Sequence, residues 1–470
     1  MIELLYGFYK KSASMSPRDL EDADAAKELR RRKLAVFLSI TFGYGFYYIC
    51  RLSFSVAKKP MMDEGIFTAT EMGFIGSSLF FAYAIGKFCN GFIADRVNIR
   101  RFMFTGLLIS ALINLLLGFT AGFWFFVILW GLNGWFQSFG APASVVAISH
   151  WFGGKERGTY YGMWATSHNI GEAITFIAIA TVITTWGWQA GFHAAGILCL
   201  GMALVILKFL YEKPAVFGLQ GQATEEDKTD DQREGKLTSQ HQAEPQAPTS
   251  SPETEKSLNV QQFTLLKNPV LWILALASAM FYVTRYAINS WGIFFLEVEK
   301  GYSTIEASTI IASGAIAGII GTFASGWISE KIFNGRHNMP ALIFGVFHTI
   351  AMCWFLLGPA DMLMDTLSMM LFGLTLGALL VYLGGLMAID ICAKATSGAA
   401  MGIIGIASYI GAAIQDILSG YLIESSKVMV DGVAVYNFEQ IYIFWIGASV
   451  VSLLLAALVW NAKSPDAAMR

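Results

Sequence analysis

Arg51 and Arg285 are each the only strong base within an apolar segment long enough to form a helix. A tyrosine stands three residues before each of them, at Tyr48 and Tyr282. Inserting a guanidinium at the centre of a bilayer costs roughly 2.5–3.5 kcal/mol on insertion scales. Arginines in such positions are therefore usually functional. The forked donors of two guanidinium groups match the oxygens of a phosphate. The pair therefore predicts an anion-binding site.

Two further titratable residues fall inside apolar segments. Lys87 lies about two helical turns from the end of its segment and would add a third positive charge; the alternative is that it extends toward Asp95. His168 lies in the middle of another segment, and the ordinary pKa of histidine, about 6.5, is close to the second pKa of a phosphate monoester, about 6. Protonation of either partner would then tune binding. Alternatively, His168 is a satisfied core residue.

Aromatic and amide side chains near the arginines are candidates to contact the rest of a ligand. Tyr44 and Tyr48 are spaced to share one helix face. Tyrosine hydroxyls can donate to phosphate oxygens or sugar hydroxyls while their rings pack, although most aromatic stripes in membrane helices only pack. The set comprises Tyr44, Tyr48, Tyr83, Tyr282 and Tyr409, with Asn289 and Trp291 as further candidates for a sugar moiety.

A purely structural role for the two arginines has to be weighed against this prediction. Each side chain would then reach a membrane interface or pair with a buried carboxylate. The matching positions of Arg51 and Arg285 in the two halves of the chain, and the few carboxylates in these segments, count against that alternative.

The elements that must hold these residues are membrane helices. Of the 470 residues, 55% are hydrophobic and 14% charged, with a mean hydropathy of +0.54, which excludes one soluble domain. Twelve apolar stretches are each about long enough to cross a hydrocarbon core of ~30 Å. They run over 34–57, 70–94, 102–121, 123–148, 158–185, 188–211, 269–296, 304–329, 340–360, 365–391, 397–423 and 438–461.

The stretches divide the chain into two bundles of six helices, at 34–212 and 269–461, in an all-α membrane protein. Between them, 213–268 is polar and predicts a flexible cytoplasmic linker. Basic residues gather before the first stretch and after the second, fourth and eighth, with Lys58 and Lys59 the main exception on the opposite side. Both tails, 1–33 and 462–470, are therefore expected in the cytoplasm, and a bacterial inner membrane is the expected location.

The second half of the chain repeats the first at a nearly constant offset of about 234–240 residues. Arg285 matches Arg51, Gly326 matches Gly91, and Gly411 matches Gly171. A parallel duplication of six helices predicts two bundles related by an axis along the membrane normal, with a central site between them.

Several motifs resemble one known family. Gly91-x-x-x-Asp95-Arg96-x-x-x-Arg100-Arg101 and its echo Gly326-x-x-x-Glu330-Lys331 resemble the signature of the major facilitator superfamily. Five motifs resemble the organophosphate:phosphate antiporter family within it, nearest to its hexose-phosphate transporter and sensor branch. In chain order these are Tyr48-x-x-Arg51, Ala82-Tyr83-x-x-x-Lys87, Lys155-Glu156-Arg157-Gly158, Ser167-His168-Asn169-Ile170-Gly171 and Tyr282-x-x-Arg285-x-x-Ile288-Asn289-x-Trp291.

This resemblance implies the major facilitator fold and a phosphate clamp at Arg51 and Arg285, with Lys87 and His168 beside it. The implied activity is exchange of an organophosphate, such as glucose-6-phosphate or glycerol-3-phosphate, for inorganic phosphate by alternating access. A membrane sensor of external sugar phosphate that signals to a partner kinase is the alternative. Leu52 and Ala165 depart from the family pattern at positions where some members have a second base and an Asn, which affects recognition of the organic moiety.

Charged residues at the ends of several helices are expected to act as gates rather than as ligands. Asp390 and Lys394 are spaced for a local ion pair, or belong to an inner gate. The other predicted gating residues are Asp95, Arg96, Arg101, Glu330 and Lys331. No nucleophile–base arrangement, metal cluster or phosphate-binding glycine loop emerges, so we expect a monomer that is not an enzyme and uses no cofactor, metal or nucleic acid.

Overall fold

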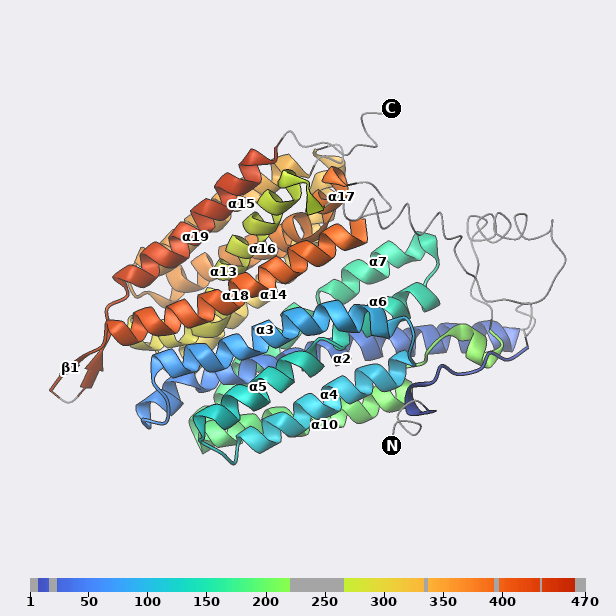
Figure 1. Cartoon of the computed structure of the whole chain (residues 1–470), viewed down its shortest axis with the longest axis horizontal. Helices are drawn as coiled ribbons and strands as arrows, with labels where there is room; N and C mark the ends of the chain where they lie inside the picture. The colour runs from blue at the N-terminus through green and yellow to red at the C-terminus, as the bar shows by residue number, and fades with distance from the viewer. Residues whose placement is uncertain are drawn as a thin grey trace.

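The helices of this protein lie side by side in two groups (Figure 1). The computed structural model describes residues 7–16, 23–219, 266–333, 337–392, 397–431 and 433–460. The N-terminal group, blue to green, and the C-terminal group, yellow to red, run along the same long axis (Figure 1). This arrangement confirms the predicted all-α fold of two bundles.

The N-terminal group contains the first half of the chain. Thr68 and Glu71 form a reciprocal capping box that starts its second long helix, and Gly187 takes a φ of 86° at the sharp turn between α9 and α10. Its helices are α2 (Ala23–Asp63), α3 (Ala69–Ala94), α4 (Ile99–Leu117), α5 (Phe123–Gln137), α6 (Gly140–Trp151), α7 (Gly154–Ala165), α8 (Ser167–Ile174), η1 (Thr175–Ile179), α9 (Ala180–Trp186) and α10 (Trp188–Phe209), followed by the short 3₁₀ turn η2 (Pro214–Phe217).

The C-terminal group repeats this plan and adds a small β-hairpin. Strands β1 (Val428–Val430) and β2 (Val433–Val435) pair antiparallel, with Val428 opposite Val435. Its helices are α13 (Pro269–Val298), α14 (Thr304–Lys331), α15 (Asn338–Leu357), α16 (Met362–Val381), η3 (Tyr382–Leu386), α17 (Met387–Ile391), α18 (Ser397–Ser425) and α19 (Glu439–Leu458).

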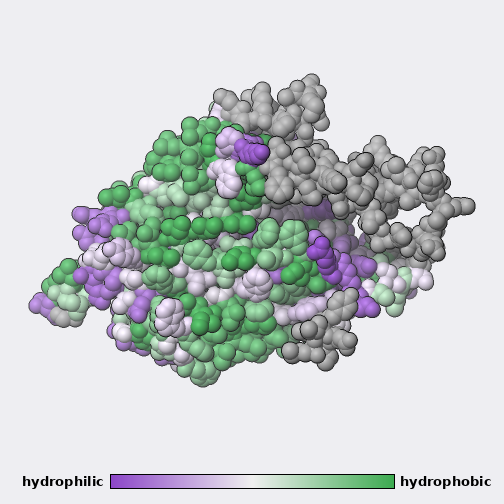
Figure 2. Space-filling view, viewed as in Figure 1, coloured by the Kyte–Doolittle hydropathy of each residue, from purple (hydrophilic) through white to green (hydrophobic). Residues whose placement is uncertain are grey.

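Eleven helical segments of the described residues are long and apolar enough to cross a membrane. The fourth predicted stretch is the exception, because it is divided into α5 and α6, of 15 and 12 residues, neither of which is long enough alone. Counted together, α5 and α6 supply the twelfth predicted span. Apolar side chains cover the sides of both groups, while polar ones gather toward the ends (Figure 2). The chain is an integral, multi-pass membrane protein.

Two of the spans contain a π-helical turn. η1 follows α8 within the fifth span, and η3 joins α16 to α17 within the tenth. Such turns are rare and frequently mark functional sites in helices.

The two ends of the molecule differ in the elements that lie there. The hairpin end holds the β-hairpin together with the helix ends at Asp63, Ala69 and Ser425, and the terminal end holds Ala94 and Leu458 (Figure 1). Most of the predicted linker, 220–265, lies outside the described residues, as do 1–6 and 17–22 of the predicted N-terminal tail and all of the predicted C-terminal tail, 462–470.

The two groups meet where α3 packs against α18, where α2 packs against α13, and where α14 packs against the fifth span, which comprises α7, α8, η1 and α9. The α3–α18 contact is closest toward the hairpin end, where glycines let the backbones meet. A Cβ on Gly73 would lie 2.4 Å from the carbonyl oxygen of Asp416, and one on Gly420 would lie 2.4 Å from that of Ala69. Close backbone approach at small residues is the usual basis of tight helix packing in membranes.

Candidate functional site

Arg51 and Arg285 come from different groups and both face the interface between them. Arg51 lies on α2 and Arg285 on α13, and each residue is only 3% exposed. A small cavity between the groups is lined by Arg51, Asn289 and Asp416, and it has room for little more than one water molecule. A ligand the size of a sugar phosphate would therefore require the two groups to move apart.

Tyrosine rings form a continuous chain between the two arginines. The guanidinium carbon of Arg51 lies 4.7 Å from the ring centre of Tyr48 and 4.4 Å from that of Tyr83. Tyr83 on α3 packs against Tyr409 on α18 at 4.4 Å, and Tyr409 packs against Tyr282 on α13 at 5.4 Å. Four of the predicted tyrosines are thus brought together at the centre.

The guanidinium of Arg51 has no hydrogen-bond partner among the residues that the structure describes. Its three side-chain nitrogens are all buried and unpaired, and the rings of Tyr48 and Tyr83 are its main neighbours. A cation over aromatic faces is stabilised electrostatically, but its N–H donors stay unsatisfied. Nε2 of His168 is likewise buried and unpaired, and the imidazole lies 5.8 Å from the ring of Tyr48. The unpaired N–H donors of Arg51 leave the centre ready to accept an anion.

Two other predicted residues lie at the margins of this centre. The ammonium group of Lys87 lies 5.5 Å from the ring centre of Tyr409, and it forms no ion pair with Asp95 in the part of the chain that the structure describes. Tyr44 is buried between Tyr48, at 5.6 Å, and Trp164, at 5.1 Å, and so supports the cluster from one side. Lys87 is thus directed toward the interface between the groups.

Glu172 is the carboxylate that sequence reasoning missed. It lies on α8, and its Oε1 accepts hydrogen bonds from Nη2 of Arg285 and Nδ2 of Asn289, both at 3.0 Å. The argument that carboxylates are scarce around the arginines was wrong for Arg285. One signal was available, because Glu172 stands four residues after His168 and shares its helix face.

A second buried charge pair lies between the cavity and the hairpin end. Nζ of Lys58 on α2 lies 3.1 Å from Oδ1 of Asp416 on α18, and neither residue is exposed. Ser290 and Trp291 donate to the same carboxylate oxygen, at 2.7 and 2.5 Å. The expectation that Lys58 lies in a loop was wrong, because α2 continues to Asp63.

The Lys58–Asp416 pair also determines where Trp291 lies, a residue predicted from the sequence to contact a sugar moiety. Its indole N–H is already used by Asp416, and its ring lies under the ammonium of Lys58 at 3.6 Å. Trp291 therefore holds the contact between the groups, away from the tyrosine chain. Asn289 does face the centre, although its amide is occupied by Glu172.

Gly76 on α3 is the position where the Lys58–Asp416 pair can least tolerate added volume. A Cβ there would lie 1.7 Å from Oδ2 of Asp416, so Gly76→Ala is expected to lower stability by about 1–3 kcal/mol through overpacking. Thermal unfolding in detergent would measure the loss. Gly91→Ala is the matched control, because nothing lies within 4 Å of a Cβ at that position of the same helix. Equal stability of the two variants would contradict the tight fit.

Five of the seven predicted gating residues lie at the terminal end within the described part of the chain. Asp95 and Arg96 are exposed after α3, and Arg101 contacts the backbone carbonyl of Phe8 within the N-terminal group. Glu330 and Lys331 are exposed at the end of α14. Lys394 and the side chain of Asp390 lie outside the described residues. The gating role of all seven stays a prediction.

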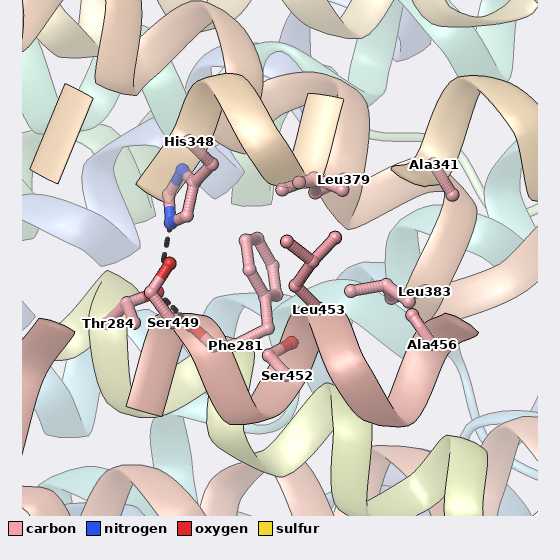
Figure 3. A pocket seen from close by; sticks show the side chains of 11 residues that line it. Phe281, Thr284, Ala341, His348, Leu379, Leu383, Ser449, Ser452, Leu453 and Ala456 are labelled. Atoms are coloured by element: carbon pink, nitrogen blue, oxygen red, sulfur yellow. Dashed lines mark hydrogen bonds between the residues drawn. The ribbon is translucent and has the colours of Figure 1, made fainter. Parts of the chain in front are cut away.

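A separate polar pocket lies inside the C-terminal group (Figure 3). His348 on α15 is hydrogen-bonded through both ring nitrogens, to Thr284 at 3.0 Å and to Thr375 at 3.1 Å. Phe281, Leu379 and Leu453 fill much of the remaining wall (Figure 3). Because its histidine is already satisfied, this pocket has the features of a packed polar core rather than of a ligand site.

The sequence as a whole matches the Major Facilitator Superfamily over residues 40–415. It is 32% identical over 456 residues to a probable hexose phosphate transport protein of Chlamydia pneumoniae, covering 96% of each chain. The chain belongs to the organophosphate:phosphate antiporter family of this superfamily.

Other members of this family are similar over nearly the whole chain. A membrane sensor protein, UhpC, of Salmonella typhimurium is 30% identical over 454 residues, covering 95% of each chain. A glycerol-3-phosphate transporter of Bacillus subtilis is also 30% identical, covering 94% of this chain and 95% of its own. None of these relatives is an enzyme, which confirms that expectation.

Solved structures support the same fold. A bacterial homologue of the human lysosomal transporter Spinster, in an inward-facing and unoccupied conformation, superposes with a TM-score of 0.68 at 15% identity, covering 92% of this chain and 98% of the other. A nucleoside transporter superposes with a TM-score of 0.69 at 14% identity, covering 91% of this chain and all of the other. At these identities the likeness establishes the major facilitator fold alone.

Proposed function

We propose that this protein exchanges an organophosphate for inorganic phosphate across the membrane, with the phosphate group bridging Arg51 and Arg285. The observation that carries the proposal is the guanidinium of Arg51, which is buried at 3% exposure beside the interface between the two groups and has no hydrogen-bond partner in the part of the chain that the structure describes. An uncompensated buried cation is costly, and an anion that meets it with several acceptors removes that cost. The names of the relatives favour phosphate esters as the class of anion.

The organic part of the ligand is proposed to meet the tyrosine chain. Tyr48, Tyr83, Tyr282 and Tyr409 offer hydroxyl groups and ring faces on both sides of the interface. Such groups suit a small polyol or sugar, which needs hydrogen bonds from every side. The similarity to a hexose phosphate transport protein favours a hexose phosphate, and the similarity to glycerol-3-phosphate transporters makes glycerol-3-phosphate the competing substrate.

The charges of Arg51 and Arg285 would also couple the movement of the ester to the movement of inorganic phosphate in an alternating-access cycle. The groups rock about the central site, and closing them without an anion buries the unpaired guanidinium of Arg51 near that of Arg285, whose charge is met only by Glu172. Like-charge repulsion and desolvation both oppose that step. The empty carrier therefore returns slowly, and a loaded return by inorganic phosphate completes exchange.

Exchange by reconstituted protein tests the proposal. Liposomes loaded with inorganic phosphate are expected to take up labelled phosphate roughly tenfold or more faster than they release it into phosphate-free medium, since each 1.4 kcal/mol of added barrier is a factor of ten. Competition with glucose-6-phosphate, glycerol-3-phosphate and phosphoenolpyruvate then identifies the ester. Equally fast release without external anion would contradict obligatory exchange, and protein-free liposomes give the background.

A membrane sensor is the second candidate, favoured by the 30% identity to membrane sensor protein UhpC over 95% of both chains. A sensor needs the same phosphate clamp but does not need to complete a transport cycle. Tight binding of a sugar phosphate without exchange would support it, and so would a neighbouring gene for a two-component kinase. A neighbouring phosphoesterase or catabolic operon would instead favour transport.

The proposal also includes the location, topology and oligomeric state of the protein. We place it in the inner membrane of a bacterium as a monomer, with the terminal end and both tails in the cytoplasm, on the distribution of basic residues. The functional units are the bundles at 34–212 and 269–461, joined by a linker at 213–268. In this orientation the hairpin end faces outward.

A further inference from the structure

The two arginines of the proposed clamp differ in how their charges are met. Arg285 donates to Glu172 at 3.0 Å, whereas no nitrogen of Arg51 has a hydrogen-bond partner within the described ranges of the chain. Glu172 is 3% exposed, so its contact with Arg285 is shielded from water. The charge of Arg285 is therefore neutralised by the protein itself, whereas the charge of Arg51 is available to be neutralised by a ligand.

The pair also connects the two groups of helices. Glu172 lies on α8 of the N-terminal group, while Arg285 and Asn289 lie on α13 of the C-terminal group. Both donors converge on a single oxygen, Oε1. A phosphate oxygen that accepts from Nη2 of Arg285 would compete with Oε1 of Glu172 for that donor, and a second negative charge beside the carboxylate would be repelled by it.

We infer that Glu172 is an internal counter-anion, which occupies Arg285 and Asn289 in the empty protein and is displaced when the phosphate of the ligand binds. The inference rests on the proposed function. Glu172 thereby lowers the affinity for phosphate, since each ligand must first replace the carboxylate. It also lets the two groups approach one another without a ligand, since one of the two positive charges is already paired.

A counter-anion and a purely structural residue are expected to respond to substitution in opposite ways. Removing the charge of Glu172 frees the donors of Arg285 and should tighten binding, whereas removal of a residue that only holds the site in shape should weaken it. Removing the charge should also slow the return of the empty carrier, because both guanidinium groups are then uncompensated. Exchange, in which a phosphate is bound throughout, should be slowed much less.

The test is Glu172→Gln in the full-length protein, with inorganic phosphate as the probe. Its dissociation constant, measured by calorimetry in detergent, is expected to fall by about tenfold, in keeping with the strength of hydrogen bonds to charged groups. The ratio of exchange to net efflux in liposomes is expected to rise by a similar factor. Glu297→Gln is the matched control, because Glu297 is 8% exposed near the hairpin end of α13 and its partner is Thr304.

The outcomes separate this inference from the proposed function. If the unaltered protein neither binds phosphate or glucose-6-phosphate nor exchanges them, the proposed function fails. If the unaltered protein exchanges phosphate but Glu172→Gln binds it equally or more weakly, only the role of Glu172 is overturned. Glu172→Ala serves as a second variant. Failure of both variants to fold would also overturn the inference, since Glu172 would then be structural and could not be displaced.

Discussion

Phosphate exchange is expected to fall by about a hundredfold or more when either Arg51 or Arg285 is replaced by lysine, since two hydrogen bonds to a charged ligand are worth about 3 kcal/mol or more together. An ammonium group keeps the positive charge but loses the planar, two-pronged donor geometry. Labelled phosphate exchange in liposomes measures the effect.

The two arginine variants need not respond equally in binding. Arg51 has no hydrogen-bond partner among the described residues, so Arg51→Lys breaks no hydrogen bond within that part of the protein. Arg285→Lys also disturbs the contact with Glu172. Arg32→Lys is a matched control, because Arg32 pairs with Glu28 one helical turn away near the start of α2. Full exchange by Arg51→Lys would remove the clamp from the proposed function.

Asp416→Asn is expected to destabilise the folded protein by about 3–5 kcal/mol, because it leaves the ammonium of Lys58 buried without a counter-charge. The shape of residue 416 hardly changes, so the effect isolates charge. Lys58→Met combined with Asp416→Asn removes both charges and should recover much of that loss. Thermal unfolding in detergent, evaluated as a double-mutant cycle, gives the coupling between the two residues.

Lys59 provides an internal comparison for this second prediction. It pairs with Asp63 on the same helix, with side-chain exposures of 29% and 60%, and exposed ion pairs contribute only about 0–1 kcal/mol. Lys59→Met should therefore change stability little. If Asp416→Asn were no more harmful than Lys59→Met, the buried pair would not hold the two groups together.

The spans and the clamp could be predicted because each has a local signal. Long apolar runs identify membrane helices, and a lone guanidinium such as Arg51 stands out within one. The repeat then places Arg51 and Arg285 in equivalent positions, and the structure brings both to the same interface. None of these steps requires knowledge of which helices touch.

The partners of the buried charges could not be predicted in the same way. Lys58 and Asp416 are 358 positions apart in the chain, and Arg285 and Glu172 are 113 apart. Such pairs are fixed by how the two groups meet, which apolar periodicity does not specify. Lys58 was also misplaced for a local reason, because the end of the apolar run hid the continuation of α2 to Asp63.

The glycines at which α3 meets α18 determine how the hairpin end can open. At Gly73 and Gly420 the barrier to water is the main chain itself, since no side chain stands between the helices there. A side-chain gate opens by rotating about its own bonds, but a main-chain seal has no such freedom. Opening along this contact therefore requires α3 and α18 to separate as rigid rods.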